Sequence, residues 1–141
     1  MSIALALGGV LLWYDVDGGS ASAAQAAPTR ASTQRGEAFG TLTGAQLAAM
    51  LQRKDFFFVN VHIPYAGEIR NTDAFIAFDK IADNLDKLPA DKSAKIVLYC
   101  QSGRMSEIAA RELARLGYSR VSHLAGGMID WKKSGYEIIQ K

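Results

Sequence analysis

The only cysteine of the chain, Cys100, stands where a hydrophobic run ends and a short polar loop begins. The run covers residues 96–99, and the loop over residues 101–103 leads into a helical pattern. A thiolate is a strong nucleophile, and its reactivity depends on what stabilises negative charge on the sulfur. Backbone N–H groups at the start of a helix lack partners within the helix and carry partial positive charge, so they favour a thiolate or a persulfide anion. The pattern therefore predicts a nucleophilic Cys100 rather than a small buried hydrophobic side chain.

Two further side chains near the loop are suited to the same chemistry. Arg104 carries a full positive charge four residues after the cysteine, so it is available to the sulfur or to an incoming anion. A solvent-exposed arginine without a ligand is the simpler interpretation of this residue. Ser106 can donate a hydrogen bond to the sulfur, although capping of the helix N-terminus is the more ordinary role for a serine at such a place.

The surrounding hydrophobic patterns predict how the cysteine is positioned. Residues 96–99 form an unbroken apolar run, which is typical of a strand buried on both faces of a parallel sheet. Further extended segments are expected at residues 38–42, 56–61, 72–78 and 120–124, and helices at residues 44–52, 81–88, 106–116 and 128–133. This alternation predicts an α/β fold with a central, mostly parallel sheet of about five strands and helices on both faces. Cys100 then lies at the carboxyl end of a strand, where open α/β sheets bind ligands.

Several local details follow from the same patterns. Thr43 is expected to cap the helix over residues 44–52, and Gly117 to end the helix over residues 106–116. Trp131 is expected to pack on the sheet. The inward face of the helix after the cysteine is predicted to consist of Ile108, Ala109, Leu113 and Leu116.

Residues 99–106, with the sequence Tyr-Cys-Gln-Ser-Gly-Arg-Met-Ser, resemble the active-site loop of single-domain rhodaneses. Residues 123–131, His-Leu-Ala-Gly-Gly-Met-Ile-Asp-Trp, are similar to the family's ending of a leucine, two glycines and a helix with a tryptophan. The two motifs have the family's order and spacing, and the resemblance extends over about residues 42–139. It implies the rhodanese-like fold and an enzyme, a thiosulfate sulfurtransferase. In such an enzyme Cys100 takes a sulfane sulfur from a donor such as thiosulfate, and the persulfide passes it to cyanide or a thiol.

The resemblance also implies the members of the site and its partners. The persulfide loop would consist of Gln101, Ser102, Gly103, Arg104, Met105 and Ser106, with the covalent persulfide in place of any cofactor. The implied partners are a small anionic sulfur donor and a thiol or cyanide acceptor, with a protein as a further option for exchanging sulfur.

The chain departs from the family after its second strand. Many rhodaneses have Asp-Val-Arg there, whereas this chain has Asn60-Val61-His62. This substitution leaves the donor and the loop geometry open. His62 is expected at the rim of the pocket, because two parallel strands end at the same edge of the sheet. Neither His62 nor His123 has a second ligand at metal spacing, so no metal site is predicted.

Two other classes of function compete with sulfur transfer. Phosphatases of the rhodanese fold also use a cysteine loop, but they place an arginine six residues beyond the cysteine to hold the phosphate. Here that position is Ser106, and Arg104 comes two residues earlier, so the loop is of the shorter kind. The second alternative is a non-catalytic sulfur carrier or binding module that serves a protein partner.

Composition and the N-terminal residues predict the organisation of the chain. Its 141 residues suffice for one core, and a formal net charge of +2 is too small to suggest nucleic-acid binding. Residues 1–27 join an uncharged apolar run to a stretch of small residues, which indicates a signal peptide or an N-terminal membrane anchor. Residues 28–36 are predicted to be a flexible linker and residues 37–141 the folded domain. Export to the periplasm, or anchoring with the domain outside, is the prediction, and a cytoplasmic protein with a disordered tail is the alternative.

Overall fold

The computed structural model describes residues 38–141. The predicted signal peptide or anchor at residues 1–27 and the predicted linker at residues 28–36 lie outside the described residues, so both stay predictions. Among residues 38–141, no helix is both long enough and apolar enough to cross a membrane.

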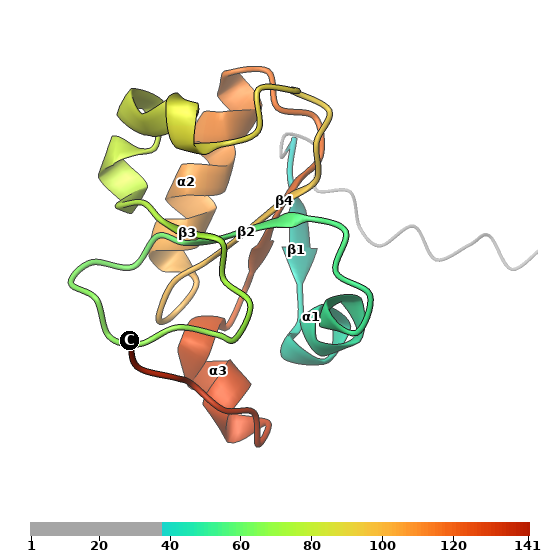
Figure 1. Ribbon diagram of the computed structural model, residues 1–141, viewed down its shortest axis with the longest axis vertical. Coiled ribbons are helices and arrows are strands. Elements are labelled where there is room, and N and C mark those ends of the chain that lie inside the picture. The colour runs from blue at the N-terminus through green and yellow to red at the C-terminus, as the bar shows by residue number, and fades with distance from the viewer. Residues whose placement is uncertain (1–37) are drawn as a thin grey trace, which may run out of the picture. The chain divides into compact units, whose positions relative to one another are not determined.

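Five parallel strands form a single sheet in the order β1-β5-β4-β2-β3 (Figure 1). The strands are β1 (Gly40–Leu42), β2 (Phe57–Asn60), β3 (Ala74–Phe75), β4 (Ile96–Tyr99) and β5 (Val121–Leu124). In the middle of the sheet, Leu98 of β4 pairs in register with Val59 of β2 and His123 of β5. The predicted α/β fold with about five mostly parallel strands is confirmed. Its central strand is the one that ends at Cys100.

Helices cover both faces of this sheet. They are α1 (Gly44–Leu51), α2 (Arg104–Arg115) and α3 (Gly127–Lys133), together with two 3-10 segments, η1 (Phe78–Lys80) and η2 (Ala82–Lys87). The segments η1 and η2 lie on the side of α2, whereas α1 lies across the sheet (Figure 1). The short helix predicted at residues 81–88 is therefore made of 3-10 turns. Asn84 has non-helical backbone angles, and its side chain donates to the Lys80 carbonyl at 2.8 Å, which competes with regular α-helix formation.

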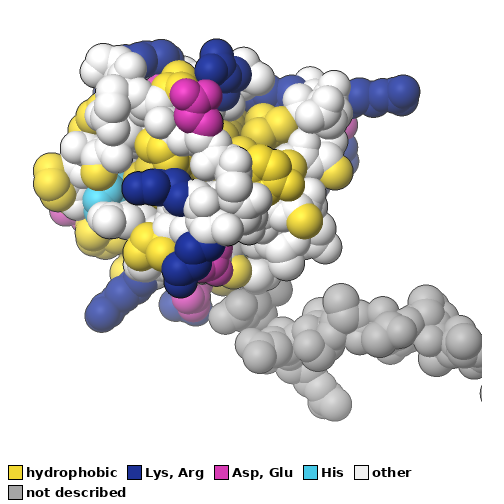
Figure 2. Space-filling model, turned by 90° about the horizontal axis from the view of Figure 1, so that it is seen from below, with side chains coloured by type: hydrophobic (Ala, Val, Ile, Leu, Met, Phe, Trp, Pro, Cys, Tyr) yellow, Lys and Arg dark blue, Asp and Glu magenta, His cyan; other side chains and the backbone are white. Residues whose placement is uncertain are grey.

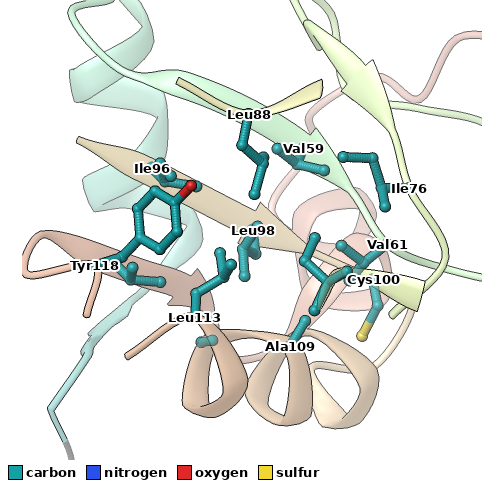
Figure 3. Close-up of a cluster of buried hydrophobic side chains, with 13 residues drawn as sticks. Val59, Val61, Ile76, Leu88, Ile96, Leu98, Cys100, Ala109, Leu113 and Tyr118 are labelled. Atoms are coloured by element: carbon teal, nitrogen blue, oxygen red, sulfur yellow. The ribbon is translucent and has the colours of Figure 1, made fainter. Parts of the chain in front are cut away.

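The residues of β4 alternate between two hydrophobic cores, one on each face of the sheet. Ile96 and Leu98 face the α2 side, where Figure 3 shows them among buried side chains of β2, α2 and the loops. Val97 and Tyr99 face the other side, together with Trp131 of α3. Burial on both faces explains why the β4 sequence is apolar without alternation. The prediction that Trp131 packs in the core is confirmed.

The start of α2 differs from the prediction. The helix begins at Arg104 with Gly103 as its N-cap, so Ser106 is the third helical residue and does not cap the helix. Ser106 is instead fully buried. The buried face of α2 also differs from the predicted one, since Ile108 was expected to face inward and is 43% exposed. The buried residues of α2 are Ser106, Ala109, Ala110 and Leu113.

The predicted start of α1 at Thr43 and the predicted end of α2 at Gly117 are both confirmed. The Thr43 hydroxyl accepts the Gln46 N–H at 3.2 Å, and the Gln46 side chain accepts the Thr43 N–H at 2.9 Å, which together form a capping box before α1. Gly117 follows α2 with φ +95°, the left-handed conformation that glycine adopts most easily after a helix.

Candidate active site

The sulfur of Cys100 lies at the point where β4 ends and the chain turns into α2. The residue is 1% exposed, and Figure 3 shows its sulfur at the end of the α2-side core, beside Val61 and directed away from Leu98. The Gly103 N–H donates to Sγ at 3.0 Å, and Ser106 Oγ lies 3.6 Å from Sγ. The N–H groups of the first turn of α2 have no acceptor within the helix. These donors favour negative charge on the sulfur, whether it is a thiolate or a persulfide.

Two glycines allow the cysteine loop to pack directly on the turn between β5 and α3. Gly103 has φ +97°, and a Cβ atom there would stand 1.8 Å from the Ala125 carbonyl oxygen. Gly127 has φ +57°, and a Cβ atom there would stand 2.5 Å from the Cys100 carbonyl oxygen. Neither position leaves room for a side chain, because the obstructing atoms are backbone atoms. The two motifs found in the sequence therefore pack against each other in space.

Hydrogen bonds fasten the same two segments together. The Met128 N–H donates to the Cys100 carbonyl at 2.9 Å, and the Ile129 N–H donates to the Gln101 carbonyl at 3.0 Å. The first turn of α3 thus supplies donors to the two residues that carry and follow the sulfur. This arrangement fixes the loop through its backbone and leaves the side chains of the loop available for other contacts.

A histidine that the sequence left without a role completes the surroundings of the sulfur. His123 of β5 is 5% exposed, and its Nδ1 lies 3.0 Å from Ser106 Oγ. Ser106 also donates to the Gly103 carbonyl at 3.0 Å. Parallel pairing of β5 with β4 and the packing of α2 on both strands bring these groups together. No local pattern signals the contact, because Ser106 and His123 are 17 residues apart on different elements.

The remaining residues of the predicted loop surround this buried centre. Gln101, Ser102 and Arg104 are exposed, and Met105 is half-buried against the α2-side core. Arg104 forms part of the wall of a pocket of about 430 Å³, together with Ser102 and His123. Within residues 38–141, none of the side-chain hydrogen bonds and ion pairs involves the Arg104 guanidinium. Figure 2, seen from the end of the molecule at which the strands end, shows basic and hydrophobic side chains interspersed on this face.

A larger pocket of about 650 Å³ has Gln101 of the cysteine loop in its lining. Its other lining residues come mostly from α3 and the C-terminal segment, and include Ile129, Lys132 and Tyr136. The C-terminal segment is held in place by an antiparallel bridge, in which the Glu68 and Ile139 N–H groups each donate to the carbonyl of the other residue at 2.8 Å. Both pockets are therefore lined in part by residues of the cysteine loop.

The loop after β2 leaves the sheet at this same edge. The Asn60 side chain donates to the Gly67 carbonyl at 3.0 Å and accepts the His62 N–H at 3.0 Å, so it closes the first part of the loop. His62 is 8% exposed, and burial lowers the pKa of its imidazole. Among the described residues, no hydrogen bond joins His62 to the cysteine loop. The residues 38–141 also contain no group of three His, Cys, Asp or Glu side chains that could hold a metal ion.

Comparisons with known proteins agree with this geometry. The model of the rhodanese-like domain family matches residues 46–134. The tRNA uridine(34) hydroxylase of Erwinia tasmaniensis is 30% identical over 102 residues, which are 68% of this chain and 29% of that protein. The chain therefore spans less than a third of the length of this curated relative.

Solved structures show the same fold. A rhodanese-related protein from Thermoplasma volcanium superposes with a TM-score of 0.62 at 21% identity, over 72% of this chain and 99% of the other. A rhodanese-like domain protein from Staphylococcus aureus superposes with a TM-score of 0.60 at 26% identity, again over 72% and 99%. Since the family model covers well over half of the chain and the architecture agrees, this chain belongs to the rhodanese-like domain family.

Proposed function

We propose that the chain is a sulfurtransferase in which Cys100 alternates between thiolate and persulfide. The observation that carries this proposal is the position of Sγ, which receives the Gly103 N–H at 3.0 Å at the carboxyl end of the central strand. The thiolate attacks the outer sulfur of thiosulfate, so that a new S–S bond forms and sulfite leaves with the electron pair of the broken S–S bond. Cyanide or an acceptor thiolate then attacks the outer sulfur, and Cys100 leaves as a thiolate. Covalent catalysis of this kind divides one displacement into two easier ones.

Arg104 is proposed to bind the anionic donor. Its guanidinium is exposed beside the cysteine loop, at the first position of α2, and no carboxylate among residues 38–141 pairs with it. A charged hydrogen bond to an oxyanion stabilises a complex by about 1.5–3 kcal/mol. Such a group affects donor binding more than the chemical step, because the charge of the donor is present before the reaction begins.

The phosphatase alternative receives less support from the site. At the position where those enzymes hold phosphate with an arginine, this chain has Ser106, which is buried and lies 3.6 Å from Sγ. The sulfur-carrier alternative shares the persulfide with our proposal and differs only in the acceptor. The names of the curated relatives refer to a tRNA modification, and this chain matches less than a third of such a protein.

Intact-protein mass spectrometry tests the proposal on the full chain. Because the chain has one cysteine, an added sulfur atom can be assigned to Cys100. Thiosulfate should add the mass of one sulfur, cyanide should remove it with formation of thiocyanate, and Cys100→Ser should abolish the adduct. No adduct in the folded wild-type protein, or an adduct in Cys100→Ser, would overturn the proposal. An adduct that cyanide and small thiols leave in place would favour the carrier.

Steady-state kinetics test the role of Arg104. Arg104→Ala should raise the KM for thiosulfate by about tenfold or more, since about 1.4 kcal/mol of binding corresponds to a factor of ten, with a much smaller change in kcat. Arg120→Ala is the matched control, because Arg120 is an exposed arginine just before the start of β5. It therefore lies at the amino end of the parallel strands, whereas Cys100 lies at their carboxyl end. Equal KM values in the two variants would remove Arg104 from the donor site.

A further inference from the structure

The proposed persulfide cycle leaves one buried titratable side chain near the sulfur unexplained. His123 is 5% exposed and reaches the sulfur through Ser106, with 3.0 Å from Nδ1 to Oγ and 3.6 Å from Oγ to Sγ. The three side chains come from the end of β4, from α2 and from β5, so only the tertiary structure brings them together. They form an unbroken chain of polar atoms that leads away from the nucleophile.

The hydroxyl of Ser106 links the protonation of the two ends of this chain. A serine has one O–H proton, and here it faces Sγ, the Gly103 carbonyl and Nδ1. While Cys100 is a thiol, its S–H points to Oγ and the serine proton is free to point to Nδ1. Once the sulfur is an anion, Ser106 can turn its proton toward the sulfur. A proton on Nδ1 then supplies Oγ with the hydrogen bond it would otherwise lack.

We propose that His123 is a positioning residue that takes up the Cys100 proton through Ser106. The S–H bond breaks and leaves its electron pair on the sulfur, the proton passes to Oγ, and the former serine proton passes to Nδ1. No electron is transferred and no further reactant is needed. The resulting state is a thiolate, a serine and an imidazolium in sequence, in which the sulfur accepts hydrogen bonds from both Gly103 and Ser106. The inference rests on the proposed function only in that the thiolate is the reactive form.

The surroundings of His123 are compatible with a positive charge and with proton exchange. It lines the pocket of about 430 Å³ with Arg104 and Glu107 of α2, so its proton has a route to solvent. The Glu107 carboxylate favours an imidazolium, whereas the Arg104 guanidinium opposes it. Glu107 also accepts a hydrogen bond from Arg111 at 2.9 Å.

The other elements around His123 contribute no charge within the described part of the chain. The Phe39 ring packs edge-on against the imidazole at 5.6 Å between centroids. The Arg111 guanidinium lies 5.9 Å from the centroid of the Phe39 ring. In the sheet, the register neighbours of His123 are Thr41 of β1 and Leu98 of β4. Within residues 38–141, the charged groups near His123 are therefore those of α2 and the sulfur itself.

The pH dependence of Cys100 alkylation by iodoacetamide tests the inference without any sulfur donor. In the full chain, His123→Asn keeps an amide that can hydrogen-bond Ser106 and removes the group that accepts the proton. We expect the pH of half-maximal alkylation rate to rise by about one unit, as for the loss of one nearby charge, while the limiting rate at high pH stays the same. Ser106→Ala should shift the midpoint similarly, and the double variant should add little, since both act through one path.

The control is Tyr118→Phe, which removes a partly buried hydrogen bond, 3.3 Å to the Pro89 carbonyl, at the opposite end of the α2-side core from the sulfur (Figure 3). A purely structural role for His123 predicts that the midpoint in a folded His123→Asn variant equals that of the wild type, and this result would overturn the inference. A second measurement uses the wild-type sequence alone. The NMR titration of the His123 ring should move to lower pH after Cys100 is alkylated, because the neighbouring anion is lost. An unchanged titration would also overturn the inference.

These outcomes are separate from those of the sulfur-adduct experiment. A shifted alkylation midpoint without any persulfide from thiosulfate would support the proton path and refute the proposed donor. A persulfide from thiosulfate with an unshifted alkylation midpoint would refute the proton path and support the proposed donor.

Discussion

Two loops leave neighbouring strands at the same edge of the sheet, yet they are held in different ways. The loop after β4 is short, and backbone atoms pack on backbone atoms where Gly103 meets Ala125 and Gly127 meets Cys100. The loop between β2 and β3 is much longer, and besides the backbone bridge between Glu68 and Ile139 it is held by side-chain hydrogen bonds. The Tyr99 hydroxyl, from the end of β4, accepts the N–H of the loop residue Ile69 at 3.0 Å and lies 2.7 Å from the Thr72 hydroxyl.

The difference indicates a division of work between the two loops. Backbone packing without space for a Cβ fixes the sulfur and its donors to within a narrow range of positions, as preorganised stabilisation of an anion requires. Side-chain hydrogen bonds, such as those of Asn60 and Tyr99, hold the other loop in a way that substitution can change while the sheet stays intact. We therefore expect changes in the first loop to affect the chemistry and changes in the second to affect stability and donor choice.

The largest effect is expected when a side chain is forced into the backbone contact. Gly103→Ala combines φ +97° with a Cβ atom only 1.8 Å from the Ala125 carbonyl oxygen. Gly117→Ala is the matched control, since Gly117 has φ +95° and nothing within 4 Å of the added Cβ. The control should lose about 1–2 kcal/mol from the left-handed conformation alone, and Gly103→Ala clearly more, together with persulfide formation. Urea unfolding and the sulfur-adduct assay measure both, and equal losses would show that the contact with Ala125 does not fix the loop.

An intermediate effect is expected when the loop after β2 loses a hydrogen bond to a side chain. Tyr99→Phe leaves the buried Ile69 N–H without its acceptor, which should cost about 1–3 kcal/mol of unfolding free energy. Tyr118→Phe should cost less, because its bond to the Pro89 carbonyl is longer at 3.3 Å. Urea unfolding gives both values. The folded Tyr99→Phe protein should still form the persulfide with thiosulfate. Loss of persulfide formation in the folded Tyr99→Phe variant would contradict the view that the loop after β2 affects stability rather than the chemistry.

The smallest effect is expected from the protonation of His62. Burial lowers the pKa of His62 in the folded protein below the ordinary value of 6.5, so the unfolded chain binds a proton there more readily. The free energy of unfolding should therefore decrease as the pH falls below about 6.5. In His62→Gln the free energy of unfolding should decrease less over the same range. Urea unfolding at pH values about one unit above and about one unit below 6.5 measures this difference. Identical pH dependence in the two proteins would show that His62 is not desolvated.

Much of the fold follows from local patterns in the sequence. The apolar run of residues 96–99, the capping Thr43 and the terminating Gly117 lie where the pattern predicted them, because strand burial and helix capping depend on neighbouring residues. The position of Cys100 at the carboxyl end of a strand follows from the same alternation of strands and helices, whereas the sheet order of the structure shows that this strand is the central one. The family resemblance of residues 99–106 and 123–131 agrees with the comparisons.

The tertiary structure decided how α2 is rotated and what surrounds the sulfur. The helix buries Ala109 and Ala110 and leaves Ile108 exposed, because small side chains let its axis approach the sheet closely. That rotation turns Ser106 inward, where it meets His123 instead of capping the helix. Helical periodicity identifies an amphipathic segment, but packing against other elements selects the buried face. The nucleophile could thus be identified from the sequence alone, whereas its contacts depend on strands and helices that are distant in the chain.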